Sequence, residues 1–297
     1  MKFLNFGSLN IDYVYAVDHI VQPGETISST GLKLHSGGKG LNQSVALARA
    51  GADVYHAGMV GPDGDMLLAV CKENGVNIQH VKTVEERSGN AIIQVSSAGQ
   101  NSIVLFSGAN RKNTKENVDE VLSHFDAGDI LLLQNEINLL DYIMEKAAEK
   151  GMVIALNPSP FDSILHGCPL DKVAIFIMNE VEGNQITGET EAEKILAKMK
   201  EMYPKATVVL TLGKDGAAYQ GADSQCRHGI YKVPVVDTTA AGDTFTGYFL
   251  AVLTEGKTPA RALEIASVAS SIAVSREGAT SSIPKREEVE GKAIEWA

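Results

Sequence analysis

One short stretch of the sequence combines an anion-binding signal with a carboxylate: residues 237–247, which read DTTAAGDTFTG. It follows an apolar, strand-like run over residues 231–236 and leads into an apolar, helix-like run over residues 248–253. The first N–H groups of a helix lack intrahelical partners and the helix dipole favours negative charge, so a phosphate is the expected guest. Asp243 would repel a phosphate unless it has a chemical task, such as taking a proton from an attacking hydroxyl. Taken alone, the stretch slightly favours an Asp that merely caps the helix.

A second glycine-rich stretch, SGGKGLNQS at residues 36–44, opens a predicted helix that Gly51 ends. Glycines allow the backbone to approach a ligand closely. The stretch is not a Walker A loop, because no Ser or Thr follows Lys39 and the GxxxxGK spacing is missing. Asn42 could cap this helix or contact ligand hydroxyls.

The elements that must position these residues alternate between strand and helix after residue 110, which is typical of a parallel sheet with helical crossovers. Strands are predicted at residues 3–7, 53–61, 130–133, 153–156, 173–177 and 207–210, and helices at 66–74, 139–150, 191–202 and 259–275. Polar or glycine residues follow each strand, which outlines a ligand cleft along the carboxyl edge of the sheet. Asn10 and Asp12 follow the first strand, where turn formation explains them as well as ligand binding does.

Two β-rich segments, about residues 13–35 and 88–109, interrupt this alternation. The second has the pattern of a hairpin, with a turn-like SSAGQN between two apolar runs. Together the segments predict a small separate sheet, which would leave exposed edges and a bare face. Such a sheet could cover a sugar-sized cleft, pack on a second subunit, or do both.

Composition limits the classes of partner. Of the 297 residues, 44% are hydrophobic and 21% charged, and the formal net charge is −11 without a basic run, which argues against nucleic acid as the main partner. Three widely spaced cysteines predict neither a zinc site nor a disulfide framework. No run approaches a membrane span, and residues 1–7 do not read as a signal peptide, so we expect a cytoplasmic protein without membrane contact.

The whole set of motifs resembles the ribokinase branch of the PfkB sugar kinase family. The pair that carries most of the resemblance is the GGKGxN loop and the DTxAAGDTFxG stretch, supported in order by NID at 10–12, PGET at 23–26, GAN at 108–110, Glu136, NPSP at 157–160, NEVE at 179–182, TLG at 211–213 and REGA at 276–279. The resemblance implies a single α/β domain over residues 1–297: a three-layer α/β/α sandwich with a mostly parallel sheet of roughly nine strands. It also implies that the two β-rich segments form a lid, often the interface of a homodimer.

The resemblance further implies ATP-dependent phosphorylation of a sugar hydroxyl. Asp243 would be the general base, and the N–H groups of Ala240, Ala241 and Gly242 would bind the oxygens that gain charge. The sugar would be bound by six residues and by Asp243 itself, the six being Asn10, Asp12, Gly38, Lys39, Asn42 and Glu136. Carboxylate and anion site then act on opposite ends of one reaction.

Similarity also assigns the nucleotide and ion sites. The nucleotide would contact Asn179, Thr211, Gly213, Gly216, Gly242 and Ser267. Mg²⁺ would be organised by Asn179 and Glu182, through water, although Glu182 also fits a first-turn helix charge. The branch is potassium-activated, and the positions that match its K⁺ site are Asp237, Thr239, Ala273, Arg276, Gly278 and Ser282.

The expected acceptor is the O5 hydroxyl of D-ribose, because Lys39 stands in GGKG where fructokinase-like relatives tend to carry GGAPAN. The alternatives are the same chemistry on deoxyribose, another pentose or hexose, or a nucleoside. From a different class, the chain could be a non-catalytic sugar- or nucleotide-binding regulator, and the intact Asp243 argues against this. A dinucleotide dehydrogenase is disfavoured, since no GxGxxG follows the first strand.

Overall fold

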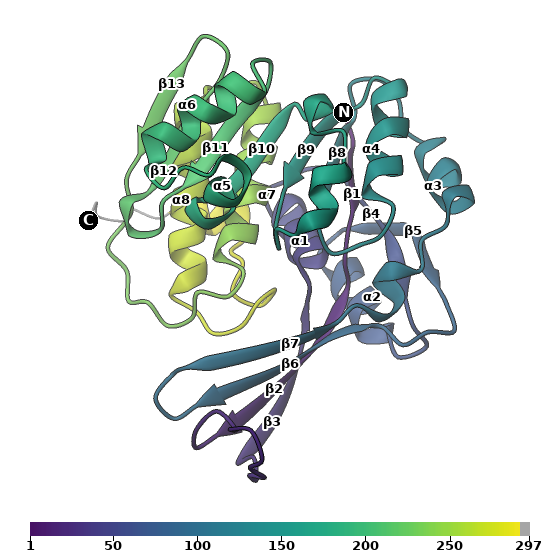
Figure 1. Cartoon of the computed structure of the whole chain (residues 1–297), viewed down its shortest axis with the longest axis vertical. Helices are drawn as coiled ribbons and strands as arrows, with labels where there is room; N and C mark the ends of the chain where they lie inside the picture. The colour runs from purple at the N-terminus through teal and green to yellow at the C-terminus, as the bar shows by residue number, and fades with distance from the viewer. Residues whose placement is uncertain (292–297) are drawn as a thin grey trace.

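The computed structural model describes residues 1–291 and contains a nine-stranded sheet and a separate four-stranded sheet (Figure 1). Residues 292–297 of the predicted domain lie outside the described residues. The strand order of the large sheet is β13 (Gln225–His228), β12 (Ala217–Gln220), β11 (Thr207–Thr211), β10 (Ile175–Asn179), β9 (Val153–Asn157), β8 (Ile130–Gln134), β1 (Phe3–Phe6), β4 (Val54–Val60) and β5 (Asn77–Thr83). The strands from β11 to β5 in this order pair in parallel, and only β12 and β13 pair antiparallel. The mostly parallel sheet is therefore confirmed.

Helices cover both faces of this sheet, so the three-layer α/β/α architecture is confirmed. One apolar core holds side chains of α1 (Lys39–Arg49), α2 (Asp65–Glu73), α7 (Ala241–Thr254), α8 (Pro259–Val274) and α9 (Arg286–Glu290). The other holds side chains of α3 (Lys115–Leu122), α4 (Leu140–Glu149), α5 (Glu180–Thr187) and α6 (Ala192–Met202). Neighbouring strand residues alternate between the cores: Phe3 packs in the first and Leu4 in the second, as the period of two requires. Short 3₁₀ turns lie at Gly108–Arg111, Ser163–Gly167, Leu170–Lys172 and Gly213–Asp215.

The two β-rich segments form one sheet, which we call the lid: β3 (Gly31–Gly37), β2 (Asn10–Val17), β6 (Gly89–Ser96) and β7 (Asn101–Phe106), in that order. It projects from the body of the molecule (Figure 1). The β6–β7 hairpin was predicted, whereas the parallel pairing of β2 with β6 was not. Because β2 begins at Asn10, both Asn10 and Asp12 are lid residues, and the alternative that they serve the turn after the first strand is wrong.

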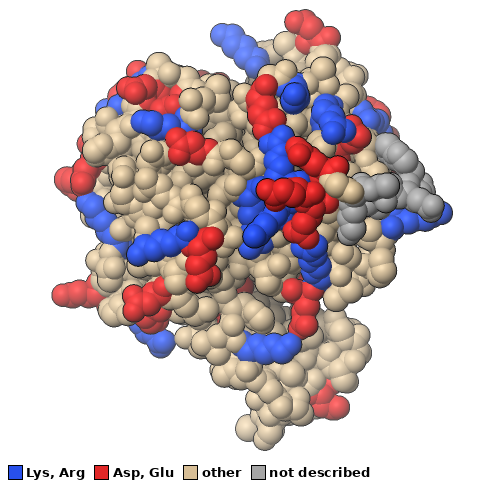
Figure 2. Space-filling view, turned by 180° about the vertical axis from the view of Figure 1, so that it is seen from behind, with Lys and Arg blue, Asp and Glu red and all other residues tan. Residues whose placement is uncertain are grey.

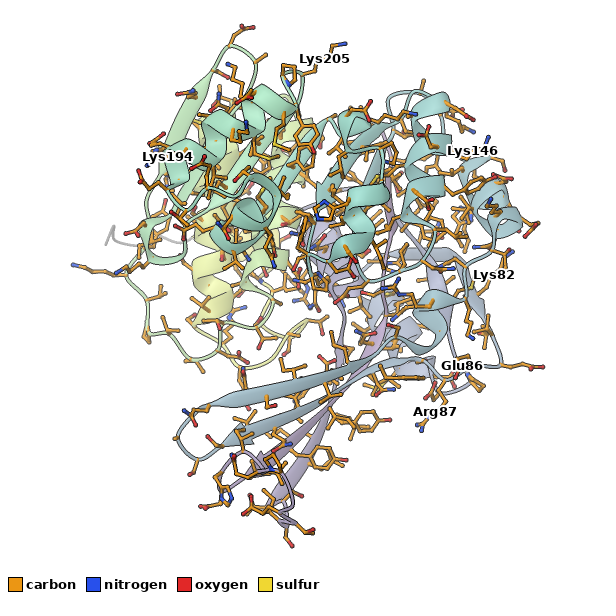
Figure 3. The ribbon with its side chains drawn as sticks, viewed as in Figure 1. Lys82, Glu86, Arg87, Lys146, Lys194 and Lys205 are labelled. Atoms are coloured by element: carbon orange, nitrogen blue, oxygen red, sulfur yellow. The ribbon has the colours of Figure 1, made fainter. Side chains whose placement is uncertain are left out.

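The root of the lid is tied to the body through the segment before β6. Ser88 Oγ accepts the Gly61 N–H at 2.9 Å, and the Ser88 N–H donates to Asp63 Oδ1 at 2.8 Å. The Ala109 N–H donates to the Arg87 carbonyl at 2.8 Å, which joins the two ends of the hairpin. Arg87 itself stands at this root, on the body side of the lid (Figure 3). The lid is thus anchored at this end, and Lys33 in the middle of β3 also contacts the body through Glu277 at 2.7 Å.

The predicted strand over residues 231–236 is wrong. Only Tyr231 forms an isolated bridge, and the segment that follows is irregular. Pro234 has no N–H to offer a ladder, and the side chains of Val235 and Val236 are 69% and 60% exposed, so no layer covers them. The N–H groups of Val236 and Asp237 instead donate to the carbonyl of Val274 at the end of α8. The anion-binding stretch is therefore fixed by a helix end rather than by a strand.

Candidate active site

The stretch that precedes α7 forms a tight turn into the helix. Ala240 is the N-cap with φ 59°, a left-handed conformation that is rare and costly for a residue with a side chain. The Ala241 N–H donates to the Thr238 carbonyl at 3.2 Å. Beyond Gly242 the space is open, since a Cβ added there would meet no atom within 4 Å. The amide of Gly242 therefore stands at an accessible helix N-terminus, while that of Ala241 is engaged within the turn.

Asp243, the third residue of α7, is held from the neighbouring helix α1. Asn42 Nδ2 donates to Asp243 Oδ2 at 3.0 Å, and Gln43 Nε2 donates to Asp243 Oδ1 at 2.9 Å. Only 7% of Asp243 is exposed. Ala240, not Asp243, is the N-cap residue of α7, and the hydrogen bonds that the structure gives the Asp243 carboxylate come from α1. A carboxylate fixed in this way, with lone pairs left over, is positioned to accept a proton.

A close contact between α1 and α7 makes these hydrogen bonds possible. Gly247 lies one helical turn after Asp243, and a Cβ added to it would come within 2.5 Å of the Ala46 Cβ and 2.7 Å of the Leu47 amide nitrogen. Ala46 itself lies about one turn after Asn42 on α1. Only glycine permits this approach, which brings the carboxamides of α1 to the carboxylate of α7.

A group of polar residues beside Asp243 is suited to several hydroxyls. Glu136 follows β8, and its Oε2 accepts hydrogen bonds from the Ser8 hydroxyl and, at 3.0 Å, from the Lys39 N–H. Desolvation first, and the charge of Glu136 second, raise the pKa of Asp12 to about 7. Gly37 pairs with Asn10 across the β2–β3 ladder, and a Cβ added to Gly37 would lie 2.0 Å from Asp12 Oδ2. An acidic side chain of the lid and one of the body thus lie close enough for the charge of Glu136 to act on Asp12.

Asn10 is fixed by a residue that the sequence interpretation did not assign. Asn110 Nδ2 donates to Asn10 Oδ1 at 2.7 Å, while Asn110 Oδ1 accepts the Leu9 N–H at 3.0 Å. Gly89 leaves the room for this pair, because a Cβ there would lie 2.1 Å from Asn110 Nδ2 and 2.2 Å from Asn10 Oδ1. The free amide group of Asn10 is therefore oriented before any ligand arrives.

Lys39 stands at the start of α1 among three carboxylates. Burial by itself would lower its pKa, but Asp243, Glu136 and Glu182 outweigh burial and raise the pKa above its usual value. Lys39 is therefore an ammonium ion. Within residues 1–291 it forms no direct ion pair, so its charge acts on the cavity as a whole. A fixed cation beside a base and a helix N-terminus suits a reaction in which negative charge develops.

Asn42 leaves one polar atom without a partner. Its Oδ1 is buried and accepts no hydrogen bond, although its Nδ2 is bound to Asp243. A buried carbonyl oxygen that lacks a donor is costly, and a ligand hydroxyl would satisfy it. Gly38, the N-cap of α1 with φ 90°, brings the backbone beside Ser8 and Asn10, so that the same cavity is lined by backbone as well.

On the far side of Asp243 the carboxyl ends of β10 and β11 present a second polar group. Asn179 and Glu182 form a capping box at α5: Asn179 Oδ1 accepts the Glu182 N–H at 2.9 Å and Glu182 Oε2 accepts the Asn179 N–H at 3.0 Å. Thr211 ends β11, and the Gly213–Asp215 turn follows it. Gly216 has φ 90° and leads into β12. Ser267 is buried on α8, which packs against β12 and β13.

The residues expected at the K⁺ site fall into two connected groups. Asp237 accepts the Thr239 N–H at 2.9 Å and hydroxyl at 2.6 Å, and the Gly278 N–H at 3.0 Å, which lowers the pKa of Asp237 despite partial burial. Ala273 and Arg276 are joined at the end of α8 by a hydrogen bond from the Arg276 N–H to the Ala273 carbonyl. Ser282 is buried nearby and donates to the Ala279 carbonyl at 2.7 Å.

Direct metal ligation by side chains is limited. Among residues 1–291 there is no group of three or more His, Cys, Asp and Glu that could hold a metal ion. Glu182 could therefore hold a cation only together with water or with oxygens of a ligand, which is the manner in which Mg²⁺ is usually bound. In the same part of the chain, no helix is long and apolar enough to cross a bilayer.

Several residues of the site were missed in the sequence. Behind Asp243, the polar side chains of Asn5, Gln43, Gln134, His56 and Asn157 are buried and hydrogen-bonded to one another or to their neighbours. A signal was present for four of them: a polar residue inside or at the end of an apolar strand, at a position whose side chain must face α1 and α7. Asn110 stands in the GAN motif at 108–110, but no role was assigned to it, and nothing in the sequence pointed to Ser8.

The fold defines a class of protein: an α/β protein with a small separate sheet and a buried carboxylate, Asp243, in the first turn of α7. The chain belongs to the pfkB family of carbohydrate kinases, whose family model matches residues 2–286. It is therefore a phosphotransferase with an alcohol group as acceptor.

Relatives of known name cover nearly its whole length. A ribokinase of Haemophilus influenzae is 36% identical over 292 residues, covering 95% of each chain. Among solved structures, a ribokinase of Thermotoga maritima is 34% identical, with TM-score 0.85 and 98% of each chain covered. A ribokinase of Arabidopsis thaliana, solved with ribose and ATP, is 30% identical, with TM-score 0.87 and coverage of 98% and 97%.

Proposed function

We propose that this protein is an ATP-dependent kinase that phosphorylates the O5 hydroxyl of D-ribose. The observation that carries the proposal is Asp243, fixed by Asn42 and Gln43 at the N-terminus of α7 and flanked by Lys39. Relatives named ribokinase that match the chain over nearly its full length support ribose as the acceptor. The Arabidopsis ribokinase bound ribose and ATP in the same fold.

The reaction follows from these positions. Asp243 accepts the proton of the sugar hydroxyl, whose oxygen forms a bond to the γ-phosphorus of ATP as the bond from that phosphorus to the bridging oxygen breaks. ADP leaves, and the products are ribose 5-phosphate, ADP and a proton. The Gly242 amide and the Ala240 amide face the oxygens that gain charge, and Lys39 adds a fixed positive charge. The Ala241 amide joins them if its turn hydrogen bond to Thr238 opens.

The sugar would be oriented by the polar group that the lid and the body share. Asn10 offers its remaining amide donors, Asn42 Oδ1 accepts a hydroxyl proton, and the carboxylates of Asp12 and Glu136 accept others. Gly38 and Lys39 complete the floor of the cavity at the start of α1. A sugar that lacks one of these hydroxyls would leave a buried polar atom unpaired, which is an effective means of rejection.

The nucleotide would lie along β10, β11 and α8, on the other side of Asp243. Asn179, Thr211, Gly213, Gly216, Gly242 and Ser267 would contact it. Bound Mg²⁺ would neutralise charge on the phosphates. Glu182 and Asn179 would hold that ion through water, consistent with a carboxylate that has both oxygens partly occupied by the capping box.

A monovalent cation would fix the turn before α7. K⁺ would be held by oxygens of Asp237, Thr239, Ala273, Arg276, Gly278 and Ser282, largely backbone carbonyls. The clamp of Asp237 on Thr239 and Gly278 already joins the two loops involved. We expect higher kcat in K⁺ than in Na⁺ at equal ionic strength, and equal rates in the two salts would refute the site.

The lid supplies a second proposal, a homodimer. Register places Leu32, Leu34, Ile92, Val104 and Phe106 on the face of the lid opposite to Asp12, and all are between 46% and 64% exposed. Figure 2 agrees, because the lid lobe carries few charged side chains. A bare apolar face of this kind is typical of a protein–protein interface. The three thiols are free, which fits a cytoplasmic location.

A substrate screen tests the acceptor. ADP release would be measured with a coupled assay across ribose, deoxyribose, other pentoses, hexoses and nucleosides. The highest kcat/KM is expected with ribose. No turnover with ribose beside turnover with another acceptor would refute the ribose proposal and leave the kinase intact, whereas ligand binding without turnover of any acceptor would favour a non-catalytic regulator.

The pH dependence of sugar binding gives an independent check. Because the pKa of Asp12 is raised to about 7, this carboxyl carries a proton in much of the free enzyme below that pH and accepts fewer hydroxyl hydrogen bonds. We expect the KM for ribose to rise as the pH falls below about 7, and Asp12→Asn to remove this dependence. A wild-type KM that is flat from pH 6 to 8 would contradict Asp12 as a sugar ligand.

A further inference from the structure

A chain of buried carboxamides runs behind Asp243. Gln43 on α1 donates through Nε2 both to Asp243 Oδ1 at 2.9 Å and to Asn157 Oδ1 at 3.0 Å. Gln43 Oε1 accepts from Gln134 Nε2 at 2.6 Å, and the same Nε2 donates to Asn5 Oδ1 at 3.0 Å. The side chains of Gln43, Gln134 and Asn5 are fully buried. These residues come from α1, β8, β9 and β1, so the hydrogen-bonded amides connect Asp243 to the centre of the sheet.

Backbone carbonyls at the two ends of this row of amides determine which atom of each amide donates. Asn5 Nδ2 donates to the Gly40 carbonyl at 2.7 Å, and a backbone carbonyl can only accept, so Asn5 must turn its Oδ1 toward Gln134. Gln134 must therefore present its NH₂ group to Asn5 and to Gln43. Gln43 then has only its own NH₂ left for Asp243.

The hydrogen bonds of Asn157, at the other end of the row of amides, require the same orientation of the Gln43 amide. Asn157 Nδ2 donates to the Ile177 carbonyl at 2.9 Å, which leaves Asn157 Oδ1 as an acceptor for Gln43. Two backbone carbonyls on different strands thus dictate one orientation of the Gln43 amide. An amide that cannot flip always offers a donor to Asp243, which fixes the plane of the carboxylate.

We propose that Gln43 is a positioning residue for phosphoryl transfer, and that the backbone-anchored amide chain Asn5–Gln134–Gln43–Asn157 keeps Asp243 in one orientation with a donor always on its Oδ1. Gln43 contacts neither the acceptor nor the nucleotide in this role. It acts through Asp243, whereas Asn42, with a buried unpartnered Oδ1, also has an atom to offer the sugar. The proposal rests on Asp243 being the base of the proposed reaction.

The proposal predicts a separation of kcat from KM. Gln43→Met preserves length and apolar volume but removes the donor. Asp243 would keep Asn42 as its sole donor and could rotate, so we expect kcat to fall about 10–100-fold while the KM for the sugar stays within about threefold. Gln43→Glu preserves the shape and replaces the donor by a second carboxyl group. The two carboxyls would share a proton, and the acid limb of the kcat–pH profile would move upward by about one pH unit or more.

Tyr248→Phe is the matched control. Tyr248 is a fully buried residue of α7 whose hydroxyl donates to the Pro284 carbonyl at 2.8 Å, away from the cleft. Its loss removes one buried hydrogen bond from the same helix, so we expect a lower Tm and an unchanged kcat and pH profile. All variants would be compared by thermal unfolding, kcat, KM and pH profile with the best acceptor of the substrate screen.

Two results would overturn the positioning role: a folded Gln43→Met with kcat within about twofold of wild type, or a Gln43→Glu profile that superimposes on that of wild type. If Gln43→Met does not fold, the isosteric Gln43→Glu profile decides. Asp243→Asn, measured in parallel, separates the two proposals. An unchanged kcat in Asp243→Asn refutes the base itself, whereas a large loss there with normal Gln43 variants refutes only the positioning.

Discussion

The contact between α1 and α7 and the lid, formed by β2, β3, β6 and β7, bury their side chains very differently. Between α1 and α7, Gln43 and Asp243 are no more than 7% exposed, and both are hydrogen-bonded to buried side chains. In the lid, four consecutive residues of β7, Ile103 to Phe106, are each at least 50% exposed. Contacts within the protein therefore fix the side chains between α1 and α7, whereas many side chains of the lid have no such contacts.

This difference has a physical meaning for catalysis. A proton acceptor must be held within a fraction of an ångström before the substrate arrives, and a buried hydrogen-bonded network can do this. A lid that excludes water must move, so it cannot share that network. Under the proposed function, the sugar and a second copy of the chain would complete the contacts of the lid. The predictions below test this division, from the base of the cleft outward.

Replacing the base should have the largest effect. Asp243→Asn keeps the shape of the side chain but cannot accept the hydroxyl proton, so kcat should fall by about 10²–10⁴-fold. Sugar binding, measured by calorimetry, should be largely kept. Asp65→Asn is the matched control, because Asp65 is a first-turn carboxylate of α2 outside the cleft. An equal loss in both variants would mean that only helix-end charge matters.

The α1–α7 contact should come next. Gly247→Ala places a methyl group where 2.5 Å separates it from the Ala46 Cβ, so the helices must part and the donors of Asn42 and Gln43 must withdraw from Asp243. We expect a loss of stability of about 1–3 kcal/mol, measured by urea unfolding, together with a lower kcat. Gly167→Ala, where an added Cβ meets nothing within 4 Å, should change neither. Normal kcat in Gly247→Ala would show that the base does not depend on close helix packing.

The buried network behind the base should make the protein sensitive to acid. Burial lowers the pKa of His56 to about 4, and its Nε2 donates to the Gly7 carbonyl while its Nδ1 faces Ser44 Oγ. In the unfolded chain His56 binds a proton near pH 6.5, whereas in the folded chain it stays neutral down to about pH 4. The free energy of unfolding is therefore highest above pH 6.5 and falls as the pH falls below it. Between pH 7 and pH 5 this contributes about 2 kcal/mol.

His56→Gln isolates this contribution, since the glutamine does not titrate. The free energy of unfolding would be measured against pH in urea for both proteins, and the difference between the two curves should narrow as the pH falls from 7 to 5. Parallel curves would mean that His56 does not refuse its proton in the folded state.

The lid should give the smallest effect on chemistry and the clearest effect on assembly. Val104→Glu places a charge on the apolar outer face, where Val104 is 64% exposed. We expect the dimer dissociation constant to rise at least about tenfold, or 1.4 kcal/mol, by sedimentation, with kcat changed less than in Asp243→Asn or Gly247→Ala. Ala222→Glu, on the exposed turn between β12 and β13, adds the same charge to the body and should leave assembly unchanged. A wild-type monomer would refute the interface.

The two regions also differ in how much of their structure could be predicted from the sequence. The β-rich composition of the lid segments was enough to predict a separate sheet, and the hairpin followed from its turn. The parallel pairing of β2 with β6 could not be predicted, because it joins strands far apart in the chain. The sequence also misassigned residues 231–236, since apolar residues next to Pro234 have a strand-like pattern even where no neighbouring strand exists to pair with them.

By itself the sequence determined the class of chemistry. The two glycine-rich stretches and the polar ends of successive strands sufficed for the α/β fold, for the sugar kinase family and for Asp243 as a candidate base. Such features are local, because turn residues, helix starts and strand periods are encoded by near neighbours. Only the tertiary structure showed that the Asp243 carboxylate accepts hydrogen bonds from Asn42 and Gln43 of α1.

These hydrogen bonds join distant parts of the sequence: Gln43 and Asn42 lie 200 and 201 positions from Asp243, and Gln134 lies 129 positions from Asn5. No local pattern encodes which buried amide will meet which carboxylate. Their meeting depends on how closely α1 and α7 pack, and a single glycine, Gly247, permits that approach.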